Sequence, residues 1–311
     1  MIPKRVFVLG LQRSGTTWLA NMLAALPQVA AVADERHRGV HESVFFSHFA
    51  KAFGDWDDPE ARTRFFASFT TSDYAILSEL GEELLREFED TKHSYGDVFI
   101  SLMDLLADTE GCDAWVEKSP HHTLLTDDIL FAAPDAIFLM VRRNPKDLIL
   151  SRLHGFGRNP SRGLKRWRDI LRGAFAITLY QREMKRLSKN SNALLVSYEE
   201  LRQDNSTKLR QKIIDHIGID ADPAEMISAY GANTSFDKTT KKPLSLLDKM
   251  FLGIGLFVAN LTPLNRLKSA QAERDEQRGI VFPKWVWTIN PRGRAGKSVS
   301  QHEIILDDAR V

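Results

Sequence analysis

Residues 6–19 read VFVLGLQRSGTTWL, and this stretch decides the fold. An apolar run rich in β-branched residues stops at Gly10, the chain bends as far as Gly15, and a helix-favouring segment follows over 16–25. This order predicts a β-strand, an anion-binding loop and a helix whose N-terminus faces the ligand. The glycines let the backbone turn tightly, and the amides of the loop and the helix attract negative charge. We therefore expect a phosphorylated ligand at the end of the first strand.

The position of the cation in this loop distinguishes classes of phosphate-binding protein. Nucleoside-triphosphate loops follow the pattern G-x-x-x-x-G-K-[ST], in which the lysine contacts the β and γ phosphates. Here Thr16 stands in the lysine position, and Arg13 provides a cation within the loop instead. The loop is therefore suited to a phosphate but lacks the lysine of a kinase.

Composition limits the possible classes. The chain has 311 residues, of which 43% are hydrophobic, which is enough for one large α/β domain with insertions. Its formal net charge of +1 argues against a general nucleic-acid binder. Its single cysteine, Cys112, cannot form an internal disulfide. The first strand begins too early to leave room for a secretory signal, so we expect a cytoplasmic protein.

Alternating apolar and helical segments predict a central parallel sheet flanked by helices. The strongest strand candidate is 136–141, a continuous apolar run typical of a strand covered on both faces, and further strands are expected at 114–116 and 193–198. In such a sheet the ligand lies beyond the carboxyl ends of the strands. Helical spacing dominates 57–110, which we interpret as a helical insertion, and we expect variable acceptor-side helices at about 233–278.

A second anion site is predicted directly after the strand at 136–141. Arg143, Asn144 and Pro145 follow that strand, and Ser151 lies two turns into the helix that Pro145 begins. A guanidinium can bind phosphate through two hydrogen bonds, and a serine hydroxyl can add a neutral donor. Two phosphate sites on different strand ends suit a nucleotide that is phosphorylated at both its 5′ and 3′ positions.

These motifs resemble those of sulfotransferases that use 3′-phosphoadenosine-5′-phosphosulfate (PAPS). Residues 12–18 are similar to the family's 5′-phosphosulfate loop, commonly [KR]-S-G-T-T-[WL], and 143–151 are similar to its 3′-phosphate motif, roughly R-[DN]-P-x-[DN]-x-x-x-S. Residues 117–120 and 197–201 extend the resemblance over most of the chain. The resemblance implies one sulfotransferase domain over 1–311, a P-loop-like nucleotide site, PAPS as sulfuryl donor and no required metal.

The resemblance also implies which residues hold the nucleotide. They are Arg13, Ser14, Gly15, Thr16, Thr17 and Trp18 in the loop, then Arg143 and Ser151. Tyr198 is either a contact to the adenosine or its phosphate, or a core tyrosine. Arg292 and Gly293 match the family's late R-K-G-x-x-G loop, but Gly293 replaces the lysine, which leaves the roles of Arg292 and Arg294 open.

Catalytic roles follow from the same resemblance and from the analogy with phosphoryl transfer, by which Arg13 also neutralises charge on the leaving phosphate. Lys118 is similar to lysines that lie beside the transferred group in Golgi-type enzymes. Glu42 begins an E-x-x-F-F segment like the one whose glutamate removes the acceptor proton, and we expect this segment to enter a helix. Glu35 competes with it as the general base, from a charged loop over 33–41. His41 or the pair His121 and His122 would serve in an enzyme of the cytosolic type; the pair is otherwise interpreted as surface or substrate-pocket residues rather than metal ligands.

The acceptor and the partners are less specified. We expect a small-molecule, lipid or glycan acceptor and no nucleic acid. The apolar run 250–259 is about half the length needed to span a bilayer, so it is either a buried helix or a face that meets an apolar acceptor or a membrane surface. Two alternative functions remain, a P-loop kinase and a catalytically silent nucleotide-binding protein. The oligomeric state is not predicted.

Overall fold

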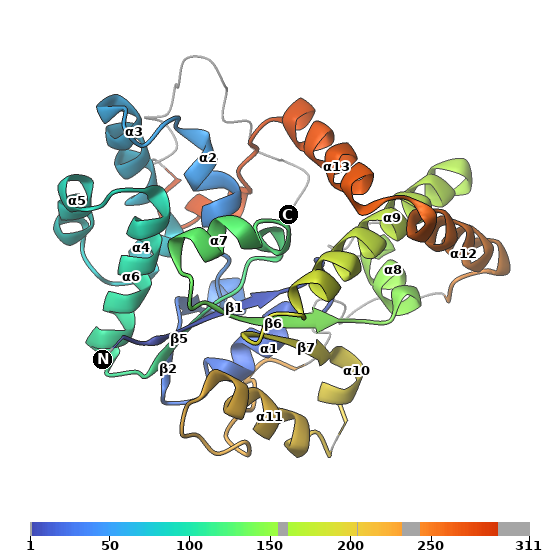
Figure 1. Ribbon diagram of the computed structural model, residues 1–311, viewed down its shortest axis with the longest axis horizontal. Helices are drawn as coiled ribbons and strands as arrows, with labels where there is room; N and C mark the ends of the chain where they lie inside the picture. The colour runs from blue at the N-terminus through green and yellow to red at the C-terminus, as the bar shows by residue number, and fades with distance from the viewer. Residues whose placement is uncertain (1, 155–160, 204, 232–242, 292–311) are drawn as a thin grey trace.

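The computed structural model describes residues 2–154, 161–203, 205–231 and 243–291. Its centre is a five-stranded parallel sheet of order β2-β5-β1-β6-β7 (Figure 1). The strands are β1 (Lys4–Leu9), β2 (Val29–Ala30), β5 (Ala114–Glu117), β6 (Ile137–Arg142) and β7 (Ala193–Ser197). The predicted α/β fold with a central parallel sheet is confirmed.

β1 lies in the middle of the sheet, and helices cover both of its faces. Phe7 and Leu9 belong to a core cluster with residues of α6 (Tyr95–Glu110) and α7 (Thr126–Ala132). Val6 and Val8 belong to a second cluster with residues of α1 (Thr16–Leu23) and α11 (Thr207–Ile217) on the opposite face. Alternate residues of one strand therefore face two layers of helices, which explains why the strand reads as a continuous apolar run.

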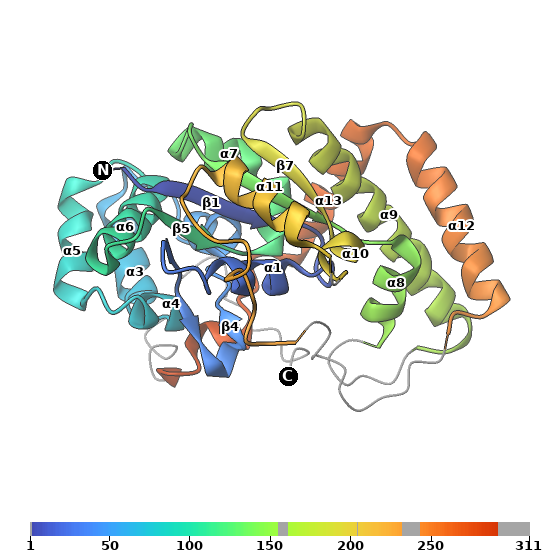
Figure 2. The ribbon, with the colours of Figure 1, turned by 90° about the horizontal axis from the view of Figure 1, so that it is seen from below.

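Four helices form the predicted insertion, which lies between β4 (Gly39–Val40) and β5. They are α3 (Pro59–Phe69), α4 (Asp73–Leu77), α5 (Glu82–Thr91) and α6. The first begins where the sequence places a helix start, since the carboxylate of Asp58 accepts a hydrogen bond from the amide of Glu60. The insertion lies at one end of the sheet (Figure 2).

At the other end of the sheet, two long helices form a projecting arm (Figures 1 and 2). They are α9 (Gly163–Leu187) and α12 (Leu246–Leu261). α8 (Pro145–Leu153) joins the arm to the sheet, and α13 (Leu264–Arg278) follows α12 after a bend of 110°. No single helix within the described ranges is long and apolar enough to cross a bilayer, although α12 and α13 together meet the criteria of length and composition.

Two short segments differ from the expectation. Residues 33–41, expected as a charged loop, form the two-residue strands β3 (Ala33–Asp34) and β4 (Gly39–Val40) around a 3₁₀ turn, η1 (Glu35–His37). The helix expected from Glu42 begins later, with a π-helical turn η2 (Phe45–Phe49) that continues into α2 (Ala50–Ala52). The intervening backbone is held by tertiary hydrogen bonds, which local sequence patterns do not reveal.

The C-terminal segment packs back onto the insertion. η6 (Lys284–Trp287) buries Val286 and Trp287 in the core cluster that contains Phe49, together with Phe282. The indole N–H of Trp287 donates to the carbonyl oxygen of Ser68 over 3.3 Å. The segment is therefore part of the core. The remaining short elements are η3 (Pro120–Leu124) and α10 (Tyr198–Leu201).

Candidate active site

The backbone conformation and close packing of the loop after β1 require two glycines. Gly10 and Gly15 have φ values of 153° and 106°, and Gly15 is the N-cap residue of α1. A Cβ atom at Gly10 would lie 2.7 Å from the Ser14 hydroxyl, and one at Gly15 would lie 2.3 Å from the ring of Tyr198. Both contacts are closer than real Cβ atoms allow, so the loop and Tyr198 can approach one another only because these positions lack side chains.

Two buried hydroxyls mark the ends of the central strands. Ser14 in the loop and Ser151 on α8 are each 1% exposed. Among the described residues neither Oγ has a hydrogen-bond partner. A buried polar group without a partner is costly, and a phosphate oxygen at each hydroxyl would supply one. The residues present therefore fit a ligand with two anionic groups.

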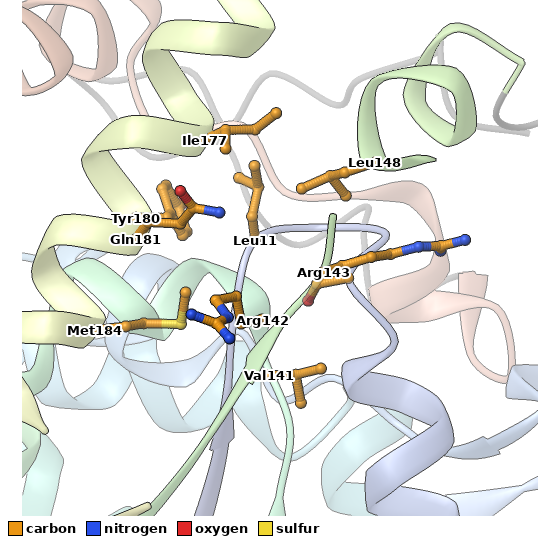
Figure 3. A pocket seen from close by; sticks show the side chains of 10 residues that line it. Leu11, Val141, Arg142, Arg143, Leu148, Ile177, Tyr180, Gln181 and Met184 are labelled. Atoms are coloured by element: carbon orange, nitrogen blue, oxygen red, sulfur yellow. The ribbon is translucent and has the colours of Figure 1, made fainter. Parts of the chain in front are cut away.

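The two predicted phosphate sites touch each other. The Nη1 of Arg143 donates to the backbone carbonyl oxygen of Arg13 over 2.9 Å. The Arg143 guanidinium also lies 4.4 Å from the centre of the Tyr198 ring, which in turn meets the ring of Trp18 edge-on. Arg143, 9% exposed, is thus fixed between the loop and an aromatic face. Figure 3 shows the neighbouring Arg142 and Arg143 pointing to opposite sides at the end of β6.

Positive charge is concentrated here. Burial lowers the pKa of Arg13 to about 10, and the charges of Arg143 and Arg152 contribute to the lowering. At neutral pH the guanidinium remains charged, so the protein holds like charges together at a partly desolvated site. Such an arrangement is favourable when an anion binds, since the ligand removes the repulsion.

The two predicted catalytic residues form an ion pair. The Nζ of Lys118 lies 2.8 Å from the Oε1 of Glu42, with 3% and 25% of their side chains exposed. Lys118 directly follows β5, and Glu42 lies in the segment between β4 and η2. The structure thus brings together an ammonium and a partly accessible carboxylate that are 76 residues apart.

A buried carboxylate that the sequence did not single out holds this pair in place. Glu117 is fully buried, and its Oε1 accepts hydrogen bonds from the hydroxyls of Ser43, over 2.7 Å, and Ser119. Burial raises the pKa of Glu117, but His122 and the two hydroxyl donors outweigh it, so the pKa is lowered overall. The chain neighbours of Glu42 and Lys118 are therefore joined through one carboxylate.

One residue of the histidine pair, His122, belongs to this network. His122 is fully buried; its Nδ1 donates to Glu117 over 3.0 Å, and its Nε2 accepts from the amide of Phe46 over 3.2 Å. These partners define its neutral tautomer. The expectation of a surface or pocket residue is wrong for His122, because a core carboxylate binds it. His121 instead contacts the phosphate loop, since the Gln12 side-chain amide donates to its Nε2 over 2.8 Å.

A third polar group, consisting of His37, His41 and Asp73, lies beside the ion pair. Their nitrogen and oxygen atoms lie within 4.8 Å of one another. Burial lowers the pKa of His41 well below its usual value, and His37 and Lys118 lower it further. Asp73 pairs with His37 over 3.2 Å and also accepts hydrogen bonds from Thr288 and, over 2.9 Å, from the amide of Ile289. Its oxygens are thus engaged in anchoring the C-terminal segment.

The other candidates have different positions. Glu35, the competing base, is exposed in η1. Thr16 and Thr17 begin α1 directly behind the loop, where their hydroxyls can reach a bound anion. Arg292 and Gly293, as well as Arg294, lie outside the described residues. Sequence reasoning missed Glu117, whose only signal is its place at the buried end of a strand, and Arg152, the neighbour of Ser151.

Comparison with known proteins identifies a family. The model of the sulfotransferase family matches residues 3–223. Solved structures with a similar fold include the sulfotransferase domain of the Synechococcus PCC 7002 olefin synthase, at 19% identity over 81% of this chain and 94% of that chain, with a TM-score of 0.46. Sulfotransferase STF1 of Mycobacterium tuberculosis H37Rv is 15% identical over 81% and 77%, with a TM-score of 0.47. A mouse sulfotransferase solved with PAP is 13% identical over 87% and 89%, with a TM-score of 0.46. The comparison with curated proteins found no match.

Proposed function

This chain belongs to the sulfotransferase family, and we propose that it transfers a sulfuryl group from PAPS to an acceptor hydroxyl. The observation that carries the proposal is the contact between two phosphate sites, in which Arg143 reaches the carbonyl oxygen of Arg13 while Ser14 and Ser151 each bury a hydroxyl without a partner among the described residues. A donor phosphorylated at both ends of its ribose matches two such sites. ATP, which has one chain of phosphates, does not.

The loop residues would bind the 5′ end of the donor. The amides at the start of α1, the Ser14 hydroxyl and the Arg13 guanidinium would surround its phosphosulfate, and Thr16 and Thr17 would add hydroxyl donors. In sulfuryl transfer the acceptor oxygen bonds to sulfur while the bond from sulfur to the phosphate oxygen breaks. Charge then grows on that phosphate, and fixed donors lower the barrier by stabilising it.

Arg143 and Ser151 would bind the 3′-phosphate. Tyr198 borders this site, because its ring packs against both Gly15 and the Arg143 guanidinium. It therefore acts by orienting the arginine, whether or not it also contacts the adenosine. Arg292 and Gly293 remain proposals for the same phosphate.

The Glu42–Lys118 pair would act on the acceptor side. The Glu42 carboxylate is the more exposed partner and would take the acceptor proton, while the ammonium of Lys118 would face the transferred sulfuryl group. Their contact over 2.8 Å keeps the base and the cation adjacent before substrates bind. We propose Glu42 rather than Glu35 as the base, since Glu35 lies exposed in η1.

Neither alternative function fits the site as well. A kinase would need a cation at the position of Thr16. A nucleotide-binding protein without catalytic activity would not require a buried lysine paired with a partly exposed carboxylate. We further propose a cytoplasmic enzyme whose acceptor is a small molecule, lipid or glycan.

Calorimetric titration tests the donor. We expect 3′,5′-adenosine bisphosphate to bind at least about tenfold more tightly than ATP with Mg²⁺, because only the former supplies both phosphates. Transfer of labelled sulfate from PAPS to a panel of alcohols then tests the reaction. Equal or tighter binding of ATP, together with its hydrolysis, would contradict the proposal.

A further inference from the structure

Helix α12 is apolar around almost its whole circumference. Between Leu246 and Leu261 its charged or amide side chains are Asp248, Lys249 and Asn260. Its inner face packs along α9, with the rings of Phe251 and Trp167 stacked at 4.9 Å. A Cβ at Gly255 would lie 2.8 Å from that of Ala174, so the two helices approach closely. This inner face accounts for only part of the apolar surface.

The outer face of α12 exposes large apolar side chains. Seven of them, each between 44% and 83% exposed, are Leu246, Leu247, Met250, Ile254, Phe257, Val258 and Leu261. Their spacing places them on one side of the helix, opposite the buried Leu252, Gly255 and Ala259. Even at roughly 60–100 Å² each, the seven together reach or exceed the ~300–600 Å² of the largest patch on a typical monomer. Figures 1 and 2 show α12 at the outer edge of the arm.

The two helices of the arm carry an excess of basic side chains. Lys249 is exposed on α12 next to Met250, and Lys165, Arg168 and Arg172 are exposed on α9, on a side turned away from its contact with α12. Asp248 is paired with Arg166 through two contacts of 2.9 Å, and Asp169 accepts a hydrogen bond from Ser161. The arm is therefore locally positive in a chain whose net charge is +1.

We propose that the outer face of α12 docks on an anionic lipid bilayer, with the helix lying in the plane of the membrane surface. An apolar helical face with flanking lysine and arginine residues is the physical requirement for such binding. The exposed Lys249 lies on α12 itself, and its long side chain can extend toward the lipid phosphates while its stem stays on apolar surface. The basic residues of α9 lie one helix layer farther from the bilayer and add a longer-range attraction that salt screens.

Two other arrangements of the outer face of α12 are disfavoured: contact with a second copy of the chain, by charge, and insertion across the bilayer, by length. A second copy meeting this face across a two-fold axis would bring two positive arms together, which is unfavourable. A transmembrane position is excluded for α12 alone, because its 16 residues span only about 24 Å against a hydrocarbon core of about 30 Å. An in-plane position buries the apolar face and leaves the α9 contact intact.

Co-sedimentation with lipid vesicles tests the proposal independently of sulfuryl transfer. We expect the full-length protein to bind vesicles of phosphatidylcholine and phosphatidylserine, to bind pure phosphatidylcholine much more weakly, and to be released by salt. The double variant Ile254→Gln/Phe257→Gln should lower the partition coefficient by at least about tenfold, because two inserted apolar side chains are lost. Lys249→Gln, which removes the basic side chain carried by α12 itself, should weaken the preference for phosphatidylserine.

Phe131→Gln is the matched control. Phe131 on α7 is 85% exposed, as apolar as Phe257, but it lies outside the arm. Its variant should bind vesicles like the unchanged protein. The proposal is overturned if the unchanged protein does not bind phosphatidylserine vesicles, or if Phe131→Gln weakens binding as much as the α12 variant does. Sedimentation velocity showing a dimer that Ile254→Gln/Phe257→Gln dissociates, without vesicle binding, would identify a second copy as the occupant instead.

Discussion

Arg143 donates a hydrogen bond from its Nη1 to the backbone carbonyl oxygen of Arg13, over 2.9 Å. This contact joins the loop after β1 to the residue that follows β6, and the two strands are neighbours in the sheet, so the two proposed phosphate sites form one contiguous unit. Adjacent strands therefore place the two halves of the proposed donor site side by side. Several measurable consequences depend on this unit and on the ion pair beside it.

Replacing Arg143 by alanine should weaken the binding of 3′,5′-adenosine bisphosphate. The variant loses a charged phosphate donor and the contact to the loop, and hydrogen bonds to charged groups contribute about 1.5–3 kcal/mol, or roughly 10–100-fold in affinity. Calorimetric titration measures the loss. Arg36→Ala is the control, because Arg36 is an exposed arginine paired with Asp34 and should leave the affinity unchanged. Unchanged affinity in the Arg143 variant would remove this residue from the nucleotide site.

Replacing Glu42 by glutamine should abolish turnover while preserving nucleotide affinity. The amide cannot accept the acceptor proton, and loss of a general base lowers kcat by about 10²–10⁴-fold. Sulfate-transfer kinetics, combined with calorimetry, separate the two effects. Glu35→Gln should be nearly fully active, since that side chain is exposed. The opposite pattern would transfer the role of base to Glu35.

Replacing Glu117 by glutamine should slow transfer without any contact to substrate. The amide oxygen can still accept from Ser43 and Ser119, but the NH₂ group cannot accept from His122, so the acceptor that joins the segments of Glu42 and Lys118 loses its negative charge and one of its three partners. We expect a lower kcat, little change in nucleotide affinity, and a loss of roughly 1–3 kcal/mol in the free energy of unfolding, because a buried donor is left without its acceptor. If kcat is retained in the variant despite the lower stability, Glu117 has a purely structural role.

Stability should fall as the pH drops below the ordinary histidine range, because His41 is buried and its pKa is lowered well below 6.5. The unfolded chain binds a proton at this residue below pH 6.5, whereas the folded chain does not until a much lower pH. The free energy of unfolding therefore increases with pH across this window, by up to about 1.4 kcal/mol per unit. Measuring the free energy of unfolding in urea for the wild type and for His41→Phe at pH 7.5, 6.5 and 5.5 tests this pH dependence. An equal slope in both proteins would assign the dependence to another group.

Replacing Gly15 by alanine should damage both the fold and nucleotide binding. The φ of 106° is unfavourable for alanine, and its Cβ would clash with the Tyr198 ring at 2.3 Å. Gly111→Ala is a matched control, since it has a positive φ of 67° but no atom within 4 Å. Backbone strain alone costs about 1–2 kcal/mol, so the control should lose only that amount, while Gly15→Ala should lose more and bind 3′,5′-adenosine bisphosphate poorly. Thermal unfolding and calorimetry compare the two variants.

The elements that the sequence predicts well are those whose cause is local. β1, β6 and α9 each carry a periodic or continuous apolar pattern, and glycines or prolines mark their ends. The sequence does not predict the strands β2, β3 and β4, because two residues are too few to show a period. Motif resemblance selected Glu42 and Lys118 separately, but their ion pair depends on Glu117 and Ser43, which are 74 residues apart and are brought together only by the completed fold.

The last described residues complete a core that the first third of the chain begins. Phe282, Val286 and Trp287 fill the cluster around Phe49, and Asp73 binds the backbone of Ile289. During synthesis the residues around Phe49 therefore leave the ribosome more than 200 residues before the segment that covers them, so this part of the core closes only after residues 282–289 have emerged.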